Sequence, residues 1–235
     1  MNYKKLYSGE HLKRINPNWT FEKWSYKHTF IAKMKYINNL LSKVPKGCRI
    51  LDVGCGQGLL VKEFKRKGYD IVGIDKFYSN EYVIKEDIFD NSFEDNSFDL
   101  ILCLDVIEHF NFDFQEKLIQ ELTRILKPKG KLIFSIPNLA HLSSRVMFLF
   151  TGNLLRTAKI SYHPGDRPIK EYLKIIKKYL KIEKKKGISA TIPGFFQLTQ
   201  LFPQYTSWLY WLIKPFNVIW GWCFNVVIIC KKKKK

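Results

Sequence analysis

Short apolar runs alternate with amphipathic segments through the middle of the chain. An apolar run of a few residues that ends at an acid or a glycine is typical of a buried strand, and apolar residues recurring three and four positions apart are typical of a helix. This pattern predicts strands at residues 49–53, 70–75, 82–85, 98–104 and 131–136, with helices at residues 59–66 and 112–126. Because strands and helices alternate, we expect an α/β fold with a doubly wound, mostly parallel sheet.

Further helices are predicted on either side of this alternation. An amphipathic segment at residues 21–42 predicts one or two helices over the ligand pocket, and residues 139–150 are apolar on one face. Pro168 suits the first turn of a helix that ends near Tyr179, because its ring fixes φ. The link between the second and third strands has only about six residues, so we expect a turn or a single helical turn instead of a crossover helix.

Three glycines at alternate positions, Gly54, Gly56 and Gly58, separate the first strand from the helix that follows it. Glycine tolerates positive φ and lets a ligand contact bare backbone, while the N-terminal amides of the helix point into the same space. Asp52 lies within the end of the strand, where its carboxylate would repel a pyrophosphate and attract a ligand that carries an amine. The alternative is a purely structural turn between strand and helix.

Acidic residues also end the next two strands. Asp75 stands where a carboxylate can accept both hydroxyls of a ribose, with a solvated strand-end acid as the alternative. Asp87 and its apolar neighbour Ile88 follow the third strand, although Glu86 or Asp90 could serve in place of Asp87.

Taken in order, these segments resemble the class I S-adenosylmethionine-dependent methyltransferases, in particular the type 11/12-like enzymes of quinone, glycan and lipid pathways. The residues that match lie between about residues 46 and 140: Asp52 to Gly58, Asp75, Glu86 to Ile88, Phe98 to Ile101, Asp105 to His109, Leu126 to Pro128 and Gly130. The resemblance implies a Rossmann-like sheet of seven strands, six of them parallel and the seventh antiparallel. We place the sixth strand at residues 181–186 and the seventh at residues 224–230.

The resemblance also implies S-adenosyl-L-methionine as the cofactor. The three glycines would lie against its methionine part, Asp52 would hold its ammonium group directly or through water, and Asp75 would take the ribose hydroxyls. Asp87 would accept from the adenine amino group, with Ile88 packed on the ring. The remaining residues of the predicted cofactor site are Cys55 and Lys76, together with Leu104 and Asp105 at the methionine end near the sulfonium.

His109 is the candidate catalytic base for a hydroxyl acceptor, because it follows the fourth strand and an unperturbed imidazole has a pKa near 6.5. The alternative is a histidine that caps a helix or binds a loop carbonyl, and His141 and His163 are reserve bases. Asp105, Glu108 and His109 are spaced to share one side of a helical turn. Some quinone-pathway relatives use a similar cluster for a divalent ion, but such groups also occur without one, and the predicted site contains no metal.

We interpret residues 1–235 as a single methyltransferase domain with four parts: an N-terminal cap at 1–45, a cofactor-binding core at 46–137, a lid insertion at 138–167 and an aromatic insertion at 188–223. Pro137, Asn138 and Arg145 match the lid segment of methyltransferases of glycan, lipid and quinone biosynthesis. A lid of this kind could cover an apolar acceptor.

The aromatic insertion has three possible structures. A transmembrane span at residues 208–230 has the required length, but Lys214 and Pro215 interrupt it and its second part is needed as the seventh strand. Interfacial helices that enter one leaflet are favoured by the aromatic residues beside lysines, and a buried or dimer-forming patch is the third alternative. The net charge of +19 would attract anionic lipid and equally RNA, but arginine is scarce, which counts against sequence-specific RNA recognition.

These observations predict O-methylation of a lipid-linked, isoprenoid or glycan small molecule, with a carbon or nitrogen acceptor as the alternative, in a cytoplasmic protein at the periphery of an anionic membrane. The five cysteines show neither metal-site spacing nor a disulfide framework, and residues 1–26 lack the apolar core of a signal peptide. The alternatives are a tRNA or rRNA methyltransferase, and a non-catalytic protein of the same fold in a membrane assembly. The sequence does not indicate an oligomeric state.

Overall fold

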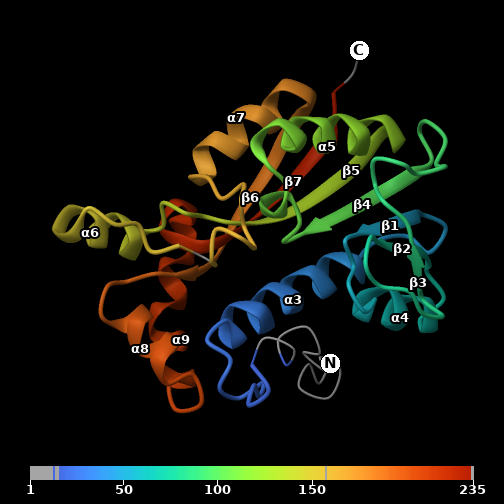
Figure 1. The fold of residues 1–235 in the computed structure, drawn as a ribbon. Coiled ribbons are helices and arrows are strands. Elements are labelled where there is room, and N and C mark those ends of the chain that lie inside the picture. Colours follow the sequence, from blue (N-terminus) through green and yellow to red (C-terminus); the bar gives the residue numbers. More distant parts are fainter. Residues whose placement is uncertain (1–12, 14–15, 157, 234–235) are drawn as a thin grey trace.

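The computed structural model describes residue 13, residues 16–156 and residues 158–233, and the described chain forms one seven-stranded sheet with helices on both faces (Figure 1). Residues 1–12 and 14–15 of the predicted cap and the last two lysines lie outside the described residues.

The strands are β1 (Arg49–Val53), β2 (Asp70–Asp75), β3 (Val83–Lys85), β4 (Phe98–Leu104), β5 (Leu126–Pro137), β6 (Leu180–Ala190) and β7 (Cys223–Lys232). Their order across the sheet is β3-β2-β1-β4-β5-β7-β6, and β7 runs antiparallel to both of its neighbours. The remaining pairs are parallel. This topology confirms the predicted Rossmann-like sheet with six parallel strands and an antiparallel seventh.

Two strands extend well beyond their predicted bounds. β5 begins at Leu126, where Phe98 pairs with it across a break in register, so the predicted helix at 112–126 ends one residue earlier. β6 continues to Ala190 because β7 offers it pairing partners as far as Cys223. The first residues of the aromatic insertion therefore belong to the sheet.

The helices are α3 (Lys27–Leu41), α4 (Leu59–Arg66), α5 (Phe112–Ile125), α6 (Leu142–Thr151), α7 (Ile169–Tyr179), α8 (Phe195–Leu201) and α9 (Ser207–Ile213). Short 3-10 turns are η1 (Ile107–His109), η2 (Lys214–Val218) and η3 (Trp220–Trp222). Residues 76–82 contain no helix, as the short link between β2 and β3 predicted.

Two helices begin later than predicted. The chain from Phe21 to Tyr26 forms turns instead of helix, with the Trp24 and Lys27 amides bonded to carbonyls three residues back. The lid helix α6 begins at Leu142 because the Asn138 side chain accepts from the Ala140 amide, which holds the preceding residues in a turn.

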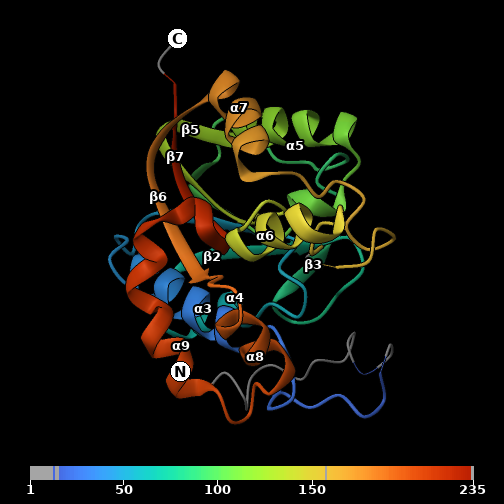
Figure 2. The ribbon, with the colours of Figure 1, turned by 90° about the vertical axis from the view of Figure 1, so that its left-hand side faces the viewer.

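Two apolar layers cover the sheet. α5 and α7 pack on one face against Leu51 and Val53, and α3 and α4 pack on the other face against Ile50 and Leu102. In Figures 1 and 2 the first pair lies above the sheet and the second pair below it. Because side chains alternate along a strand, the apolar run of β1 supplies both layers.

α6, α8 and α9 belong to neither layer and project from one end of the molecule (Figure 1). α6 follows the carboxyl end of β5, while α8 and α9 lie between β6 and β7. Among the described residues, no helix has both the length and the apolar character needed to cross a bilayer. Residues 223–232, which include the second part of the considered transmembrane span, form β7 within the sheet instead.

Candidate functional site

The glycine turn joins β1 to α4 through three residues with positive φ, at 64° for Gly54, 54° for Gly56 and 72° for Gly58. A Cβ atom added to Gly54 would lie 2.6 Å from a methyl group of Val106, and one added to Gly58 would lie 2.5 Å from a methyl group of Val83. A Cβ on Gly56 would meet nothing within 4 Å. The outer two glycines are therefore required by packing, whereas Gly56 borders open space in which a ligand can approach the backbone.

Asp75 fastens this turn to the end of β2. One carboxylate oxygen accepts the Gly56 amide at 2.9 Å, and the other accepts the amides of Phe77 at 2.8 Å and Tyr78 at 3.1 Å. A carboxylate has about four acceptor positions, so at least one remains for a ligand hydroxyl. The side chain that was predicted to bind the ribose is thus held rigidly beside the glycine turn.

Asp52 lies buried in the same part of the sheet. Burial and the neighbouring Asp75 carboxylate raise the pKa of Asp52 to about 7, although Lys33 acts in the opposite direction. A cationic group placed here would favour the ionised form of Asp52. Burial also raises the pKa of the Cys55 thiol, so this cysteine is protonated at neutral pH.

Lys76 and Asp87 contact each other, with 2.9 Å between the ammonium nitrogen and a carboxylate oxygen. Partial burial raises the pKa of Asp87, but the Phe89 amide and Lys76 outweigh that effect and hold the pKa below its usual range. Ile88 is buried in the core beneath α5. An ionised carboxylate and a buried apolar side chain therefore stand side by side after β3, and their contact with adenine stays a prediction.

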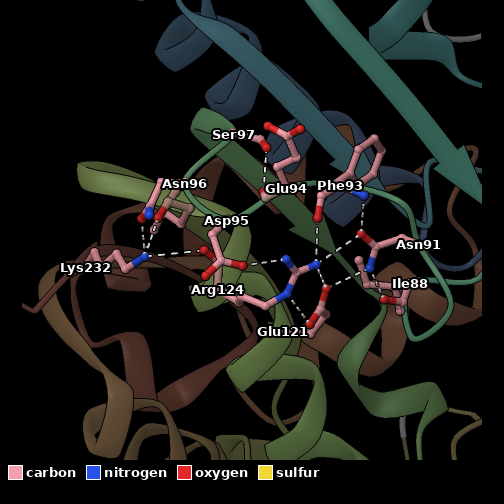
Figure 3. Close-up of polar contacts among 11 residues, drawn as sticks. Ile88, Asn91, Phe93, Glu94, Asp95, Asn96, Ser97, Glu121, Arg124 and Lys232 are labelled. Atoms are coloured by element: carbon pink, nitrogen blue, oxygen red, sulfur yellow. Dashed lines mark hydrogen bonds and ion pairs between the residues drawn. The ribbon is translucent and has the colours of Figure 1, made fainter.

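Arg124 of α5 fixes the loop that carries these residues (Figure 3). Its guanidinium donates to Asp95 at 2.7 Å, to the Phe93 carbonyl at 2.8 Å and to Glu121 at 2.6 Å. Glu121 in turn accepts from the Asn91 amide group, which also donates to the Ile88 carbonyl at 2.7 Å. Arg124 thereby holds the loop between β3 and β4 against α5.

Asp105 at the end of β4 is held by four donors. Lys33 and Tyr26, from the start of the chain, donate to one carboxylate oxygen, and Ser135 and Asn225 donate to the other at 2.6 and 2.9 Å. Burial alone would raise the pKa of Asp105, but these donors, led by Lys33, lower it. Sequence reasoning placed Asp105 near the sulfonium, and the structure shows that it also anchors the cap to the sheet.

Lys33 is the main functional residue that the sequence analysis missed. It is buried on α3 in a stripe with Phe30, Met34, Ile37 and Leu41. A lysine inside the apolar stripe of an amphipathic helix is a detectable signal, because burial of an unpaired ammonium group is costly. The sequence could not identify Asp105 as its partner.

His109 lies in η1, just beyond β4, and its Nδ1 atom is 2.8 Å from the carbonyl oxygen of Tyr162. A carbonyl only accepts hydrogen bonds, so Nδ1 carries the proton of the neutral ring and Nε2 has the free lone pair. His109 is exposed at the surface, but the surrounding chain partly desolvates its ring, and this effect and the nearby His163 lower the pKa of His109 against weaker opposing contributions. The ring is therefore neutral at physiological pH and able to accept a proton.

Asp105, Glu108 and His109 do not share a helical turn as predicted, although burial, together with the Asp105 carboxylate, raises the pKa of Glu108. Asp105 has a φ of 54° and lies before the 3-10 turn, so α-helical spacing does not apply to it. His163 joins the group instead, and Glu108, His109 and His163 each offer a ligand atom within 4.8 Å of the others. The other reserve base, His141, caps α6 through the Ser144 amide, and burial lowers its pKa to about 4.

Cofactor binding is expected to release a proton from Asp52. Because its folded pKa is about 7, close to one proton should be released per ligand at about pH 6, and affinity should rise up to about tenfold per pH unit below pH 7. In the free protein, Asp52 binds a proton that the unfolded chain does not, so stability falls as pH rises from 3.8 to about 7. Calorimetry of S-adenosylmethionine binding in buffers of different ionisation enthalpy measures the release. Asp52→Asn should abolish it, and equal release in that variant would contradict the prediction.

Known proteins resemble this chain in sequence. Residues 24–174, more than half of the chain, match the family described as a methyltransferase domain. The mitochondrial ubiquinone biosynthesis O-methyltransferase of Dictyostelium discoideum is 28% identical over 190 residues, covering 66% of this chain and 59% of that protein. The chain spans about half the length of the curated relatives it matches.

Solved structures agree on the fold. A Pyrococcus horikoshii protein has a TM-score of 0.60 at 18% identity over 95% of this chain and 99% of its own. A S-adenosylmethionine-dependent methyltransferase from Methanosarcina mazei has a TM-score of 0.56 at 18% identity, covering 84% and 98% of the two chains. With the sequence motifs and the family match, the chain belongs to the methyltransferase domain family, as a class I S-adenosylmethionine-dependent methyltransferase.

Proposed function

We propose that the protein methylates a hydroxyl oxygen of a small lipid-linked, isoprenoid or glycan acceptor. The observation that carries this proposal is the contact between His109 Nδ1 and the Tyr162 carbonyl, which leaves Nε2 as a base at the carboxyl edge of the sheet. The similarity to ubiquinone biosynthesis O-methyltransferases supports transfer to oxygen, with 32% identity over 122 residues to the Xanthomonas axonopodis protein.

The described residues divide the work of the reaction. S-adenosylmethionine, when bound, supplies a methyl group on a positively charged sulfur, and its transfer to an incoming oxygen is an in-line displacement in which positioning lowers the barrier most. Gly56 and Asp75 would orient the cofactor, and Asp52 would hold its ammonium group. His109 Nε2 takes the proton of the acceptor hydroxyl as the new C–O bond forms and the C–S bond breaks.

The lid insertion takes part in this arrangement through its backbone. Tyr162, which supplies the carbonyl bonded to His109, and His163, whose ring packs edge-on against His109 with 4.7 Å between centroids, both belong to the lid. Movement of the lid would therefore change the orientation and the proton affinity of the base. We propose that the lid closes over an apolar acceptor and sets His109 at the same time.

His109→Ala should lower kcat about 100-fold without changing the affinity for S-adenosylmethionine, because only the proton acceptor is lost. The measurement is transfer of labelled methyl groups into a membrane lipid extract, with mass spectrometry of the product to locate the methyl group on oxygen. His28→Ala, a histidine that stacks on Tyr210 and contacts the Pro203 carbonyl, is the matched control. Full activity of His109→Ala would remove the base from the proposal.

The group formed by Glu108, His109 and His163 could instead hold a divalent cation, which would lower the pKa of the acceptor hydroxyl directly. The two roles differ in their response to a chelator. If His109 is the base, EDTA should leave the rate unchanged. Loss of activity in EDTA, restored by added Mg²⁺ or Zn²⁺, would assign the three residues to a cation.

A further inference from the structure

Six strongly exposed apolar side chains project from one end of the molecule. Leu149 and Phe150 end α6, Leu201 ends α8, Tyr205 follows it, and Trp208 and Trp211 lie on α9; each is at least 60% exposed. We call these six residues the apolar tip. Figure 1 shows α6, α8 and α9 extending away from the sheet on the same side of the molecule.

The apolar tip does not belong to the buried core of the protein. α8 and α9 already bury one side each, through Phe196, Leu209 and Ile213. The seven residues of α9 are apolar except for Ser207, and a helix that is apolar all round is normally covered on every side. The outward face of α9 therefore requires a partner that the described chain does not supply.

The charges around the apolar tip indicate what kind of surface it contacts. Residues 138–165 and 191–230 contain no aspartate or glutamate. The exposed cations of these two stretches include Arg156, Lys159 and Lys214, and the Lys214 ammonium lies 4.3 Å from the centre of the Trp211 ring. Tryptophan and tyrosine beside lysine are typical of protein surfaces at the boundary between acyl chains and anionic head groups.

A second copy of the chain fits this surface less well. A two-fold interface places the same patch on both partners, so the cations of one copy would face those of the other, and residues 138–165 and 191–230 supply no carboxylate to lie between them. Stacking on single-stranded RNA would use the aromatic rings but would leave Leu149 and Leu201 in water. We propose that the apolar tip docks the protein on the surface of an anionic phospholipid bilayer.

The position of the tip relates docking to the chemistry. α6 follows the carboxyl end of β5, α8 follows that of β6, and His109 follows that of β4. These strands are parallel, so all three ends lie at one edge of the sheet. Docking therefore turns the edge that carries His109 toward the bilayer, where an apolar acceptor is dissolved. This consequence rests on the proposed function, whereas docking itself does not.

Vesicle binding by the full chain tests the proposal. Binding to vesicles of equal parts phosphatidylglycerol and phosphatidylcholine should be about tenfold tighter than to phosphatidylcholine alone at about 0.15 M salt. It should weaken but persist at about 1 M salt, because burial of apolar side chains is not screened. Alkaline carbonate should release the protein, and tryptophan fluorescence should be quenched by brominated acyl chains.

Paired variants separate the two contributions. Trp208→Ser with Trp211→Ser should weaken binding to both kinds of vesicle by at least about tenfold. Arg156→Glu, Lys159→Glu and Lys214→Glu together should weaken binding to the anionic vesicles alone. Phe114→Ser on α5 and Lys170→Glu with Lys174→Glu on α7 are matched controls at exposed residues outside the apolar tip and should change binding less than about twofold.

The proposal would be overturned by no vesicle binding by the parent chain, by equal binding by the double tryptophan variant, or by a double tryptophan variant that loses self-association or RNA binding instead. Retention through carbonate would also contradict surface docking. Calorimetry with S-adenosylmethionine on the same samples keeps the two proposals apart. A parent chain that binds the cofactor but no vesicle would overturn the docking proposal alone. Normal cofactor binding by the double tryptophan variant would show that this variant is folded.

Discussion

Replacing Asp75 with alanine should weaken the binding of S-adenosylmethionine by about 1,000-fold, or about 4 kcal/mol. A hydrogen bond from a ribose hydroxyl to the acceptor position that the three backbone amides leave open would be lost, at about 1.5 to 3 kcal/mol. The variant also deprives the Gly56, Phe77 and Tyr78 amides of their acceptor, so the glycine turn loses the contact that holds it against β2. This effect should exceed that of any other single substitution at the cofactor site.

Asp70→Ala is the matched control, because Asp70 is an exposed acid at the opposite end of the same strand. Calorimetry with S-adenosylmethionine and with its demethylated product should show nearly unchanged affinity for Asp70→Ala. If Asp75→Ala bound the cofactor as tightly as Asp70→Ala does, the ribose contact would have to be assigned elsewhere.

The parallel core was predictable because its signals are local. Each of β1, β2 and β4 is an apolar run that ends at a glycine or an acid, and their observed bounds equal the predicted ones. The same is true of α4, whose start follows from the glycine turn. Where the residues that define an element are adjacent in sequence, a single chain contains enough information to place it.

The errors in the strand bounds share a different cause, which is pairing between distant segments. β6 extends to Ala190 only because β7, some thirty residues later, lies beside it, and its Lys-rich first half gives no apolar signal. The early start of β5 similarly depends on Phe98. Strand ends that are set by a remote partner carry no signature of their own.

The site residues show the same difference between local and long-range signals. Gly56, Asp75 and Asp87 were placed by local motifs, and the structure brings them to one edge of the sheet, together with a link from Gly56 to Asp75. The group around Asp105 was not foreseen, because Lys33, Ser135 and Asn225 come from three separate parts of the chain. The hydrophobic pattern identified the buried face of α3 but not the Asp105 carboxylate that this face contacts.

Lys33→Met should lower the free energy of unfolding by about 3 kcal/mol, since methionine preserves the apolar stem but leaves the Asp105 carboxylate without its cation. For a chain of this size the loss corresponds to a fall in Tm of about 6 to 12 °C. Lys35→Met is the control, because Lys35 lies two residues further along α3 and is exposed. This substitution should change stability by less than about 0.5 kcal/mol. Urea and thermal denaturation of both variants measure the difference.

A double-mutant cycle with Asp105→Asn separates the ion pair from its neighbours. Each single change leaves one buried group unpaired, so the double variant should lose less stability than the sum of the two. The pH dependence has a definite sign: the folded pKa of Asp105 is lowered, so its contribution is present above the unfolded value of 3.8 and is lost as pH falls through the folded pKa. The deficit of Lys33→Met should therefore shrink in acid. Equal melting of Lys33→Met and Lys35→Met at neutral pH would show that the cap is held by its aromatic packing, and that the contact between Lys33 and Asp105 adds nothing to stability.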